Sequence, residues 1–231
     1  MRCMRTLVYI DGFNLFYGCL KHSDDKWLDI HRLFKDFILH AQCPEADLVC
    51  VKLFTADIKA KIATHGDAAI KAQRDYHRAL EHLYPDDVSI IKGFYSLGKA
   101  HLLAYQKPPN KDSRVDVWRL EEKQTDVNIA LTAYRDVAAR RADQVVFVTN
   151  DTDLAPALKA IREDFGGAIQ IGIVMPIRKP AAGRKARPPN ASLDRYADWT
   201  RGHIKDEELA GSALPECIPT DKKPICKPAY W

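Results

Sequence analysis

The chain has 231 residues, of which 46% are apolar, and it carries a formal net charge of +4. This length and apolar content are enough for one good-sized domain. No apolar run reaches the roughly eighteen residues of a membrane span, and the N-terminus lacks a signal-peptide pattern, so we expect a cytoplasmic protein with no membrane partner.

Runs of β-branched and aromatic residues predict strands at 6–10, 48–54, 88–95, 145–148 and 168–174. Apolar residues at helical spacing predict helices at 13–21, 29–38, 66–83, 125–141, 153–162 and 192–201. Residues 96–121 are irregular, with a proline turn and room for short edge strands. Strands that alternate with helices favour a parallel, doubly wound α/β sheet of about five strands.

The most regular helix is predicted at 125–141, where Thr125 is a suitable cap. Its apolar residues recur at helical intervals and should form the buried face: Val127, Ala130, Leu131, Tyr134, Val137 and Ala138. Asp126 falls in the first turn, where the helix dipole favours an anion.

The chain divides by composition into a domain at 1–202 and a C-terminal segment at 203–231. The segment contains several prolines and no periodicity, so it either drapes over the domain or is disordered. The cysteines are scattered with no CxxC pair, which predicts reduced thiols. A zinc site at Cys217 and Cys226 is the alternative.

The positive charge is concentrated in one stretch between 177 and 190, which contains no acidic residue. Its basic residues are Arg178, Lys179, Arg184, Lys185 and Arg187. A bound polyanion is one interpretation of this stretch, and a solvated loop is the other.

Acidic residues directly follow two of the predicted strands. Asp11 follows the first strand, and Asp151 and Asp153 follow the fourth. The carboxyl ends of parallel strands meet at one edge, where carboxylates repel one another unless a cation binds. Mg²⁺ prefers such oxygen ligands, so these residues predict a metal site. For Asp153 and Asp126 the alternative role is helix capping, and for Asp11 and Asp151 it is turn capping.

Other residues near these carboxylates have less distinct roles. Asn14 could orient Asp11 or touch a substrate, and Lys123 could contact a phosphate. The chain has no GxGxxG or Walker A motif and no HExxH pair, so we expect no nucleotide cofactor and no imidazole metal site. The chemistry that remains is metal-assisted hydrolysis of a phosphodiester, with the basic stretch holding the substrate's phosphates.

Three segments together resemble the NYN domain family of the PIN-like nuclease superfamily, and LabA-like members most of all. They are Tyr9-Ile10-Asp11-Gly12-Phe13-Asn14-Leu15, Glu122-Lys123-Gln124-Thr125-Asp126-Val127-Asn128 and Thr149-Asn150-Asp151-Thr152-Asp153-Leu154-Ala155-Pro156. The resemblance implies a PIN-like three-layer sandwich with a central, mostly parallel sheet of about five strands flanked by helices. It also implies an acidic pocket that binds Mg²⁺ or Mn²⁺.

By the same resemblance, the metal-binding and catalytic residues are Asp11, Asp126, Asp151 and Asp153, with Glu121 or Glu122 as a further acidic residue. The sequence therefore predicts a divalent-metal-dependent ribonuclease, which is a hydrolase that binds RNA. A homodimer is one oligomeric state that we consider for it. The alternatives are an RNA-binding or regulatory module with little turnover, and a small-molecule phosphohydrolase.

Overall fold

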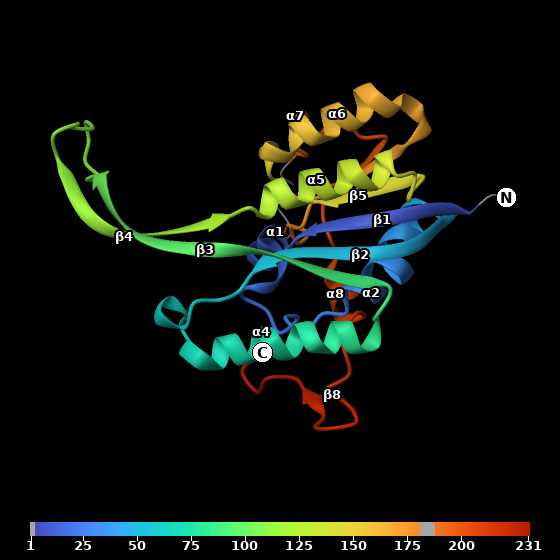
Figure 1. Cartoon of the computed structure of the whole chain (residues 1–231), viewed down its shortest axis with the longest axis horizontal. Coiled ribbons are helices and arrows are strands. Elements are labelled where there is room, and N and C mark those ends of the chain that lie inside the picture. The colour runs from blue at the N-terminus through green and yellow to red at the C-terminus, as the bar shows by residue number, and fades with distance from the viewer. Residues whose placement is uncertain (1–2, 181–187) are drawn as a thin grey trace.

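The computed structural model describes residues 3–180 and 188–231. Its centre is a sheet of seven strands in the order β4-β3-β2-β1-β5-β6-β7 (Figure 1). Neighbouring strands are parallel except for the antiparallel pair at one edge, β3 with β4. The strands are β1 (Met4–Asp11), β2 (Ala46–Ala56), β3 (Val88–Leu103), β4 (Arg114–Lys123), β5 (Gln144–Val148), β6 (Gln170–Val174) and β7 (Trp199–Arg201).

Helices pack on both faces of this sheet. One face carries α5 (Thr125–Ala138), α6 (Ala155–Phe165) and α7 (Ala191–Asp194). On the other face lie α4 (Gly66–Leu83) and two composite helices. The first joins α1 (Gly12–Leu15) to a π-helical turn, η1 (Phe16–Leu20); the second runs through α2 (Ile30–Arg32), η2 (Leu33–Leu39) and α3 (His40–Gln42).

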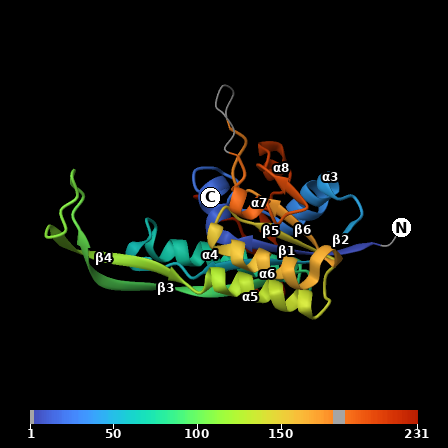
Figure 2. The ribbon, with the colours of Figure 1, turned by 90° about the horizontal axis from the view of Figure 1, so that it is seen from above.

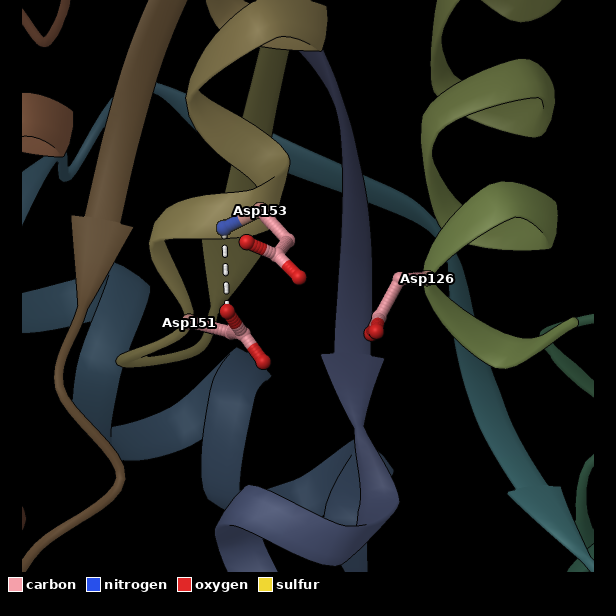
Figure 3. A group of neighbouring side chains, drawn as sticks. All are labelled: Asp126, Asp151 and Asp153. Carbon is pink, nitrogen blue, oxygen red and sulfur yellow. Dashed lines mark hydrogen bonds between the residues drawn. The ribbon is translucent and has the colours of Figure 1, made fainter. Parts of the chain in front are cut away.

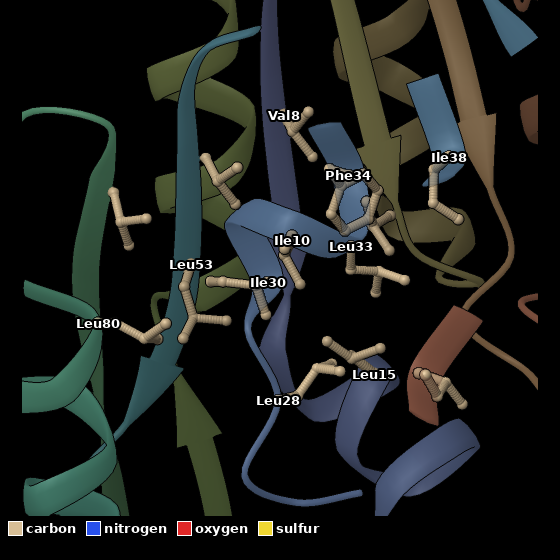
Figure 4. Close-up of a cluster of buried hydrophobic side chains, with 14 of the residues drawn as sticks. Val8, Ile10, Leu15, Leu28, Ile30, Leu33, Phe34, Ile38, Leu53 and Leu80 are labelled. Atoms are coloured by element: carbon tan, nitrogen blue, oxygen red, sulfur yellow. The ribbon is translucent and has the colours of Figure 1, made fainter. Parts of the chain in front are cut away.

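Alternation along β1 divides the core between the two faces. Val8 and Ile10 point into a cluster with Phe34, Leu53 and Leu80 (Figure 4). Leu7 and Tyr9, which alternate with them along the strand, pack into a second cluster beneath α5 and α6. Because successive side chains point to opposite faces and both faces are covered, the strand is continuously apolar from Leu7 to Ile10.

The prediction of a mostly parallel, five-stranded PIN-like sandwich is wrong: the sheet is mixed, has seven strands and ends in an antiparallel edge, although the fold is α/β. The missed pairing runs from Phe94 opposite Lys123 to Leu103 opposite Arg114. This hairpin extends well beyond the helical layers (Figures 1 and 2), so its side chains are mostly exposed and lack an apolar pattern. β7 was also missed, because residues 192–201 were predicted to be one helix and only Ala191–Asp194 are helical.

The predicted helix at 66–83 is confirmed, whereas the predicted buried face of α5 is wrong in part. Val127 and Leu131 are each 59% exposed, while Ile129, Ala133 and Val137 are buried. The buried face also contains Thr125 and Asp136. A search for apolar periodicity does not detect these two residues because they are polar. The helix is therefore rotated from the orientation that the apolar stripe predicts.

The segment after residue 202 is structured and packs on the core. It contains α8 (Asp206–Ala210) and a small hairpin of β8 (Cys217–Ile218) and β9 (Ile225–Cys226). A disulfide joins Cys217 to Cys226, so the prediction of reduced thiols is wrong for these two residues, and their sulfurs are not zinc ligands. Within 3–180 and 188–231, no helix has both the length and the apolar character needed to cross a bilayer.

Candidate functional site

Asp11 lies at the carboxyl end of β1 and holds the start of the next helix. It is 2% exposed, and its Oδ1 accepts hydrogen bonds from the backbone N–H groups of Phe13 (3.0 Å) and Asn14 (2.9 Å). Its Oδ2 accepts from the hydroxyl of Thr149, at the end of β5, at 3.3 Å. Burial raises the pKa of Asp11, and these hydrogen bonds oppose that rise. Asp11 therefore serves as a helix cap that ties β1 to β5.

Asn14 extends the same connection. Its side-chain amide donates to Asp11, and its Oδ1 accepts from the backbone N–H of Asn150 at 3.1 Å. Both polar ends of Asn14 are thus used inside the protein. The structure supports the orienting role considered for this residue, and the substrate contact stays a prediction.

Three carboxylates converge beside this network. Asp126 lies in the first turn of α5, and Asp151 and Asp153 lie after β5 at the 3₁₀ turn η4 (Thr152–Leu154). One oxygen from each carboxylate lies within 4.8 Å of the others, across the carboxyl end of β1 (Figure 3). Asp151 caps the turn, because its Oδ1 accepts from the backbone N–H of Asp153 at 2.9 Å. Asp153 is exposed and does not cap the helix, which leaves its carboxylate available.

Charge accumulation at this edge is most evident at Asp126. Its pKa is raised to about 6, first by burial and then by the negative charges of Asp11, Asp151, Glu122 and Asp153. Asp11 thus adds negative charge to the site while its oxygens are engaged elsewhere. Three converging carboxylates form a donor set that suits a hard divalent cation such as Mg²⁺ or Mn²⁺.

Removing the charge at Asp126 should stabilise the protein at neutral pH. The raised pKa of Asp126 means that the folded state holds a proton that the unfolded state has released, so stability falls as the pH rises from about 4 through about 6. With chelator present, we expect Asp126→Asn to unfold with a free energy about 1–2 kcal/mol higher than wild type at pH 8, after allowance for solvent screening, and a similar one at pH 4. Urea titrations at both pH values measure this difference. Asp86→Asn is the control, because it makes the same change of charge at an exposed residue. An equal gain in the free energy of unfolding for Asp86→Asn would contradict the explanation.

The two acidic residues before Lys123, Glu121 and Glu122, have different partners because neighbouring side chains of β4 point to opposite faces. The negative charge of Glu122 raises the pKa of Asp126, and the Oε1 of Glu122 accepts a hydrogen bond from the backbone N–H of Thr125 at 3.1 Å. Glu121 instead forms ion pairs with Arg119 at 2.5 Å and Lys123 at 2.9 Å. Of the two candidates for a further acidic residue, Glu122 is therefore the one beside the cluster. Lys123 is held by a neighbouring carboxylate, and its contact with a phosphate stays a prediction.

The basic stretch is only partly described. Arg178 is bound within the fold: it pairs with Asp25 and with Asp206 (2.5 Å), and its Nε donates to the carbonyl of Cys19 at 2.7 Å. Lys179, the next residue, is exposed. The remaining predicted phosphate contacts, Arg184, Lys185 and Arg187, lie outside the described residues.

A cavity of about 610 Å³ opens at the same edge of the sheet, and the sequence did not indicate it. It lies between α1, η1, α4, the end of β2 and the base of the hairpin. Gly12 and Phe13, which directly follow Asp11, form part of its wall. Many of its side chains are aromatic: Phe13, Phe16, Tyr17, Tyr76, Tyr95 and Trp231. They come from distant segments, so no local motif marks them.

Comparison with known proteins identifies the class to which this chain belongs, which is a family of enzymes. No family model matches the chain. It is 38% identical over 244 residues to 6-hydroxy-3-succinoylpyridine 3-monooxygenase HspA of Pseudomonas putida (strain DSM 28022 / S16), an alignment that covers 99% of this chain and 75% of that protein. The chain belongs to the family of this monooxygenase.

A solved structure gives a weaker likeness. VPA0982 of Vibrio parahaemolyticus, a protein of unknown function, is 16% identical, with a TM-score of 0.48 over 89% of this chain and 96% of that one. At this TM-score the likeness carries no argument.

The monooxygenase relative overturns the functional prediction made from the sequence. Metal-dependent hydrolysis of RNA, with the nuclease and hydrolase class that accompanies it, is wrong for a member of this family, although the prediction of an enzyme is correct. Carboxylates at a strand edge indicate where a cation fits, and several unrelated reactions use such a site. The resemblance to the NYN family, the RNA partner and the homodimer stay predictions.

Proposed function

We propose that this protein is a monooxygenase whose substrate is a hydroxylated pyridine with a short acidic side chain. The observation that carries the proposal is the 38% identity to a 6-hydroxy-3-succinoylpyridine 3-monooxygenase along 99% of the chain. The alignment spans the segments that form the carboxylate cluster and the cavity, rather than a short fragment of the chain.

The geometry suits a reaction on an aromatic ring. The cavity has a volume typical of small-molecule sites and aromatic walls, and Gly12 and Phe13 connect it to Asp11 at the edge of the carboxylate cluster. A monooxygenase inserts one oxygen atom of O₂ into the substrate and reduces the other to water, with two electrons from a reductant. The protein's part is to hold the ring away from bulk water and fix its orientation.

The helix start after β1 does not suit the pyrophosphate of a dinucleotide. A phosphate there would need the free N–H groups of the first turn. In this structure the Asp11 carboxylate already accepts hydrogen bonds from Phe13 and Asn14, and its negative charge would repel a phosphate. A dinucleotide reductant would therefore bind elsewhere or act as a diffusing partner.

The proposal includes a divalent cation held by Asp126, Asp151 and Asp153. Their carboxylate oxygens fit a hard cation, which would neutralise the charge that raises the pKa of Asp126. When bound, such an ion supplies a positive charge and coordinates oxygen atoms. The chain's own contribution is the fixed position of Asp151, whose Oδ1 is held by the backbone N–H of Asp153.

Isotope-labelled oxygen tests the proposed activity. Purified protein is incubated with 6-hydroxy-3-succinoylpyridine, NADH and ¹⁸O₂, with and without free flavin, and in separate reactions with Mg²⁺, Mn²⁺ or Fe²⁺. We expect substrate-dependent oxygen consumption and one ¹⁸O atom in a product that keeps the pyridine ring. Consumption no greater than without substrate, under every one of these conditions, would refute the proposed activity.

A further inference from the structure

The charged groups that line the cavity are all basic. Its wall contains Lys21, Lys26 and Lys59 together with three histidines, and no aspartate or glutamate among the described residues. His77, at the cavity wall, is buried, and burial lowers its pKa to about 4, so it is neutral at physiological pH. The lysines therefore set the sign of the local potential, which favours an anion.

The aromatic side chains form two walls suited to a flat ring. Phe13 and Tyr95 meet edge to face, with centroids 5.5 Å apart and an interplanar angle of 67°. Tyr76 and Trp231 make a similar contact at 5.8 Å and 61°. Aromatic rings prefer offset-stacked or edge-to-face neighbours, so a planar ligand can pack against either pair.

Lys59 is the lysine at this cavity without an internal partner. Lys26 donates to the carbonyl of Ser23 at 2.6 Å, and Lys21 lies 4.9 Å from the ring centroid of Tyr17. Lys59 is exposed, and in the parts of the chain that the structure describes it forms no ion pair or hydrogen bond through its side chain. A ligand carboxylate there would gain a charged partner without breaking an existing contact.

The backbone next to Lys59 is held in place by α4. The side chain of Gln73 donates to the carbonyl of Ala56 and accepts from the backbone N–H of Ile58, both at 2.9 Å. These two hydrogen bonds fix the loop that carries Lys59 at the rim of the cavity. A preorganised loop reduces the entropy lost when a ligand binds.

We propose that this cavity binds an aromatic ring that bears a short carboxylate side chain, with the ring against the Phe13–Tyr95 pair and the carboxylate at Lys59. This inference rests on the proposed function for the identity of the ring. Phe13 donates its backbone N–H to Asp11, and Tyr95 lies opposite Glu122 in the hairpin register. The bound ring therefore lies beside the carboxylate cluster, and its anionic group lies at Lys59.

Calorimetric binding of two probes tests the assignment: 3-succinoylpyridine, which is an anion, and its neutral side-chain amide. We expect Lys59→Met to weaken binding of the acid by about tenfold or more and to leave amide binding nearly unchanged. Lys61→Met removes an exposed lysine two positions away that does not line the cavity, and it should alter neither affinity. Ala69→Phe places a ring in the cavity and should abolish binding of both probes, with thermal melting used to confirm that each variant is folded.

Unchanged acid binding in Lys59→Met, or equal losses in Lys59→Met and Lys61→Met, would overturn the assignment, as would intact binding in folded Ala69→Phe. If Ala69→Phe does not fold, the contrast between the two lysine variants still decides. The assignment and the proposed function fail separately. Binding with the expected pattern but no oxygenation removes the function alone, whereas oxygenation that survives in folded Ala69→Phe removes the cavity assignment alone.

Discussion

Replacing Asp136 by alanine is expected to lower the free energy of unfolding by about 3–5 kcal/mol. Asp136 lies on the buried face of α5 and is 2% exposed. It accepts hydrogen bonds from the hydroxyl of Tyr9 (3.0 Å) and from Arg141 (3.1 Å), and it pairs with Lys52. The side chain of Lys52 is only 15% exposed, so the variant would leave a nearly buried charge without its counter-ion. Most of the loss comes from that uncompensated charge.

Urea unfolding followed by circular dichroism measures this change. Asp164→Ala is the matched control, because Asp164 also accepts from a tyrosine hydroxyl, that of Tyr134 at 2.6 Å, but in an exposed position. We expect the control to lose less than about 1 kcal/mol. The double variant Asp136→Ala with Lys52→Met should recover part of the loss, since it removes the unpaired ammonium. A loss in Asp136→Ala no larger than that of the control would show that the ion pair contributes little.

The central strands could be predicted because their sequences are constrained on both faces. All five residues of β5, Gln144–Val148, are buried, and a buried parallel strand reads as a continuous apolar run. The acidic residues after β1 and β5 were predictable for a related reason, since parallel strands bring their carboxyl ends to one edge. The structure brings Asp126, Asp151 and Asp153 together, and it shows that Asp11 is a buried cap beside them.

The rest depends on contacts between distant segments, which local patterns do not report. The β3–β4 hairpin exposes large side chains such as Trp118, which is 77% exposed, so its strands lack the alternation that marks a half-buried sheet. The orientation of α5 is set partly by Asp136 and its ion pair with Lys52 of β2. The cavity likewise draws its wall from the N-terminal helix, α4, the hairpin and Trp231. The set of side chains that lines the cavity can therefore be identified only from the folded structure.

The second large effect is expected from Asp151→Asn, which should reduce cation affinity and kcat/KM for the proposed oxygenation by about 100-fold or more. Asparagine caps helices about as well as aspartate, and its Oδ1 can still accept the hydrogen bond from the backbone N–H of Asp153. The variant therefore removes one negative ligand while it keeps the turn that positions Asp153. We expect melting temperatures measured with chelator to be unchanged or slightly raised, because like-charge repulsion decreases.

Cation binding is measured by calorimetry with Mn²⁺, and activity by oxygen consumption at several Mn²⁺ concentrations. Asp112→Asn, which makes the same change of charge on the exposed hairpin loop, is the control and should match wild type. If Asp151→Asn loses cation affinity but keeps full activity, the cation has a structural role at most. If excess Mn²⁺ restores turnover, the lost affinity explains the lost activity.

The pH dependence of cation binding connects this result to Asp126. Its pKa of about 6 describes a site in which other carboxylates oppose its ionisation. A cation must displace the proton from Asp126, so Mn²⁺ affinity in wild type should fall as the pH decreases below about 6. In Asp151→Asn one of the opposing charges is absent, which lowers the pKa of Asp126 and moves this fall to a lower pH. A pH profile that shifts in this direction requires Asp126 and Asp151 to act on the same bound ion, whereas two profiles of identical shape would place the ion elsewhere.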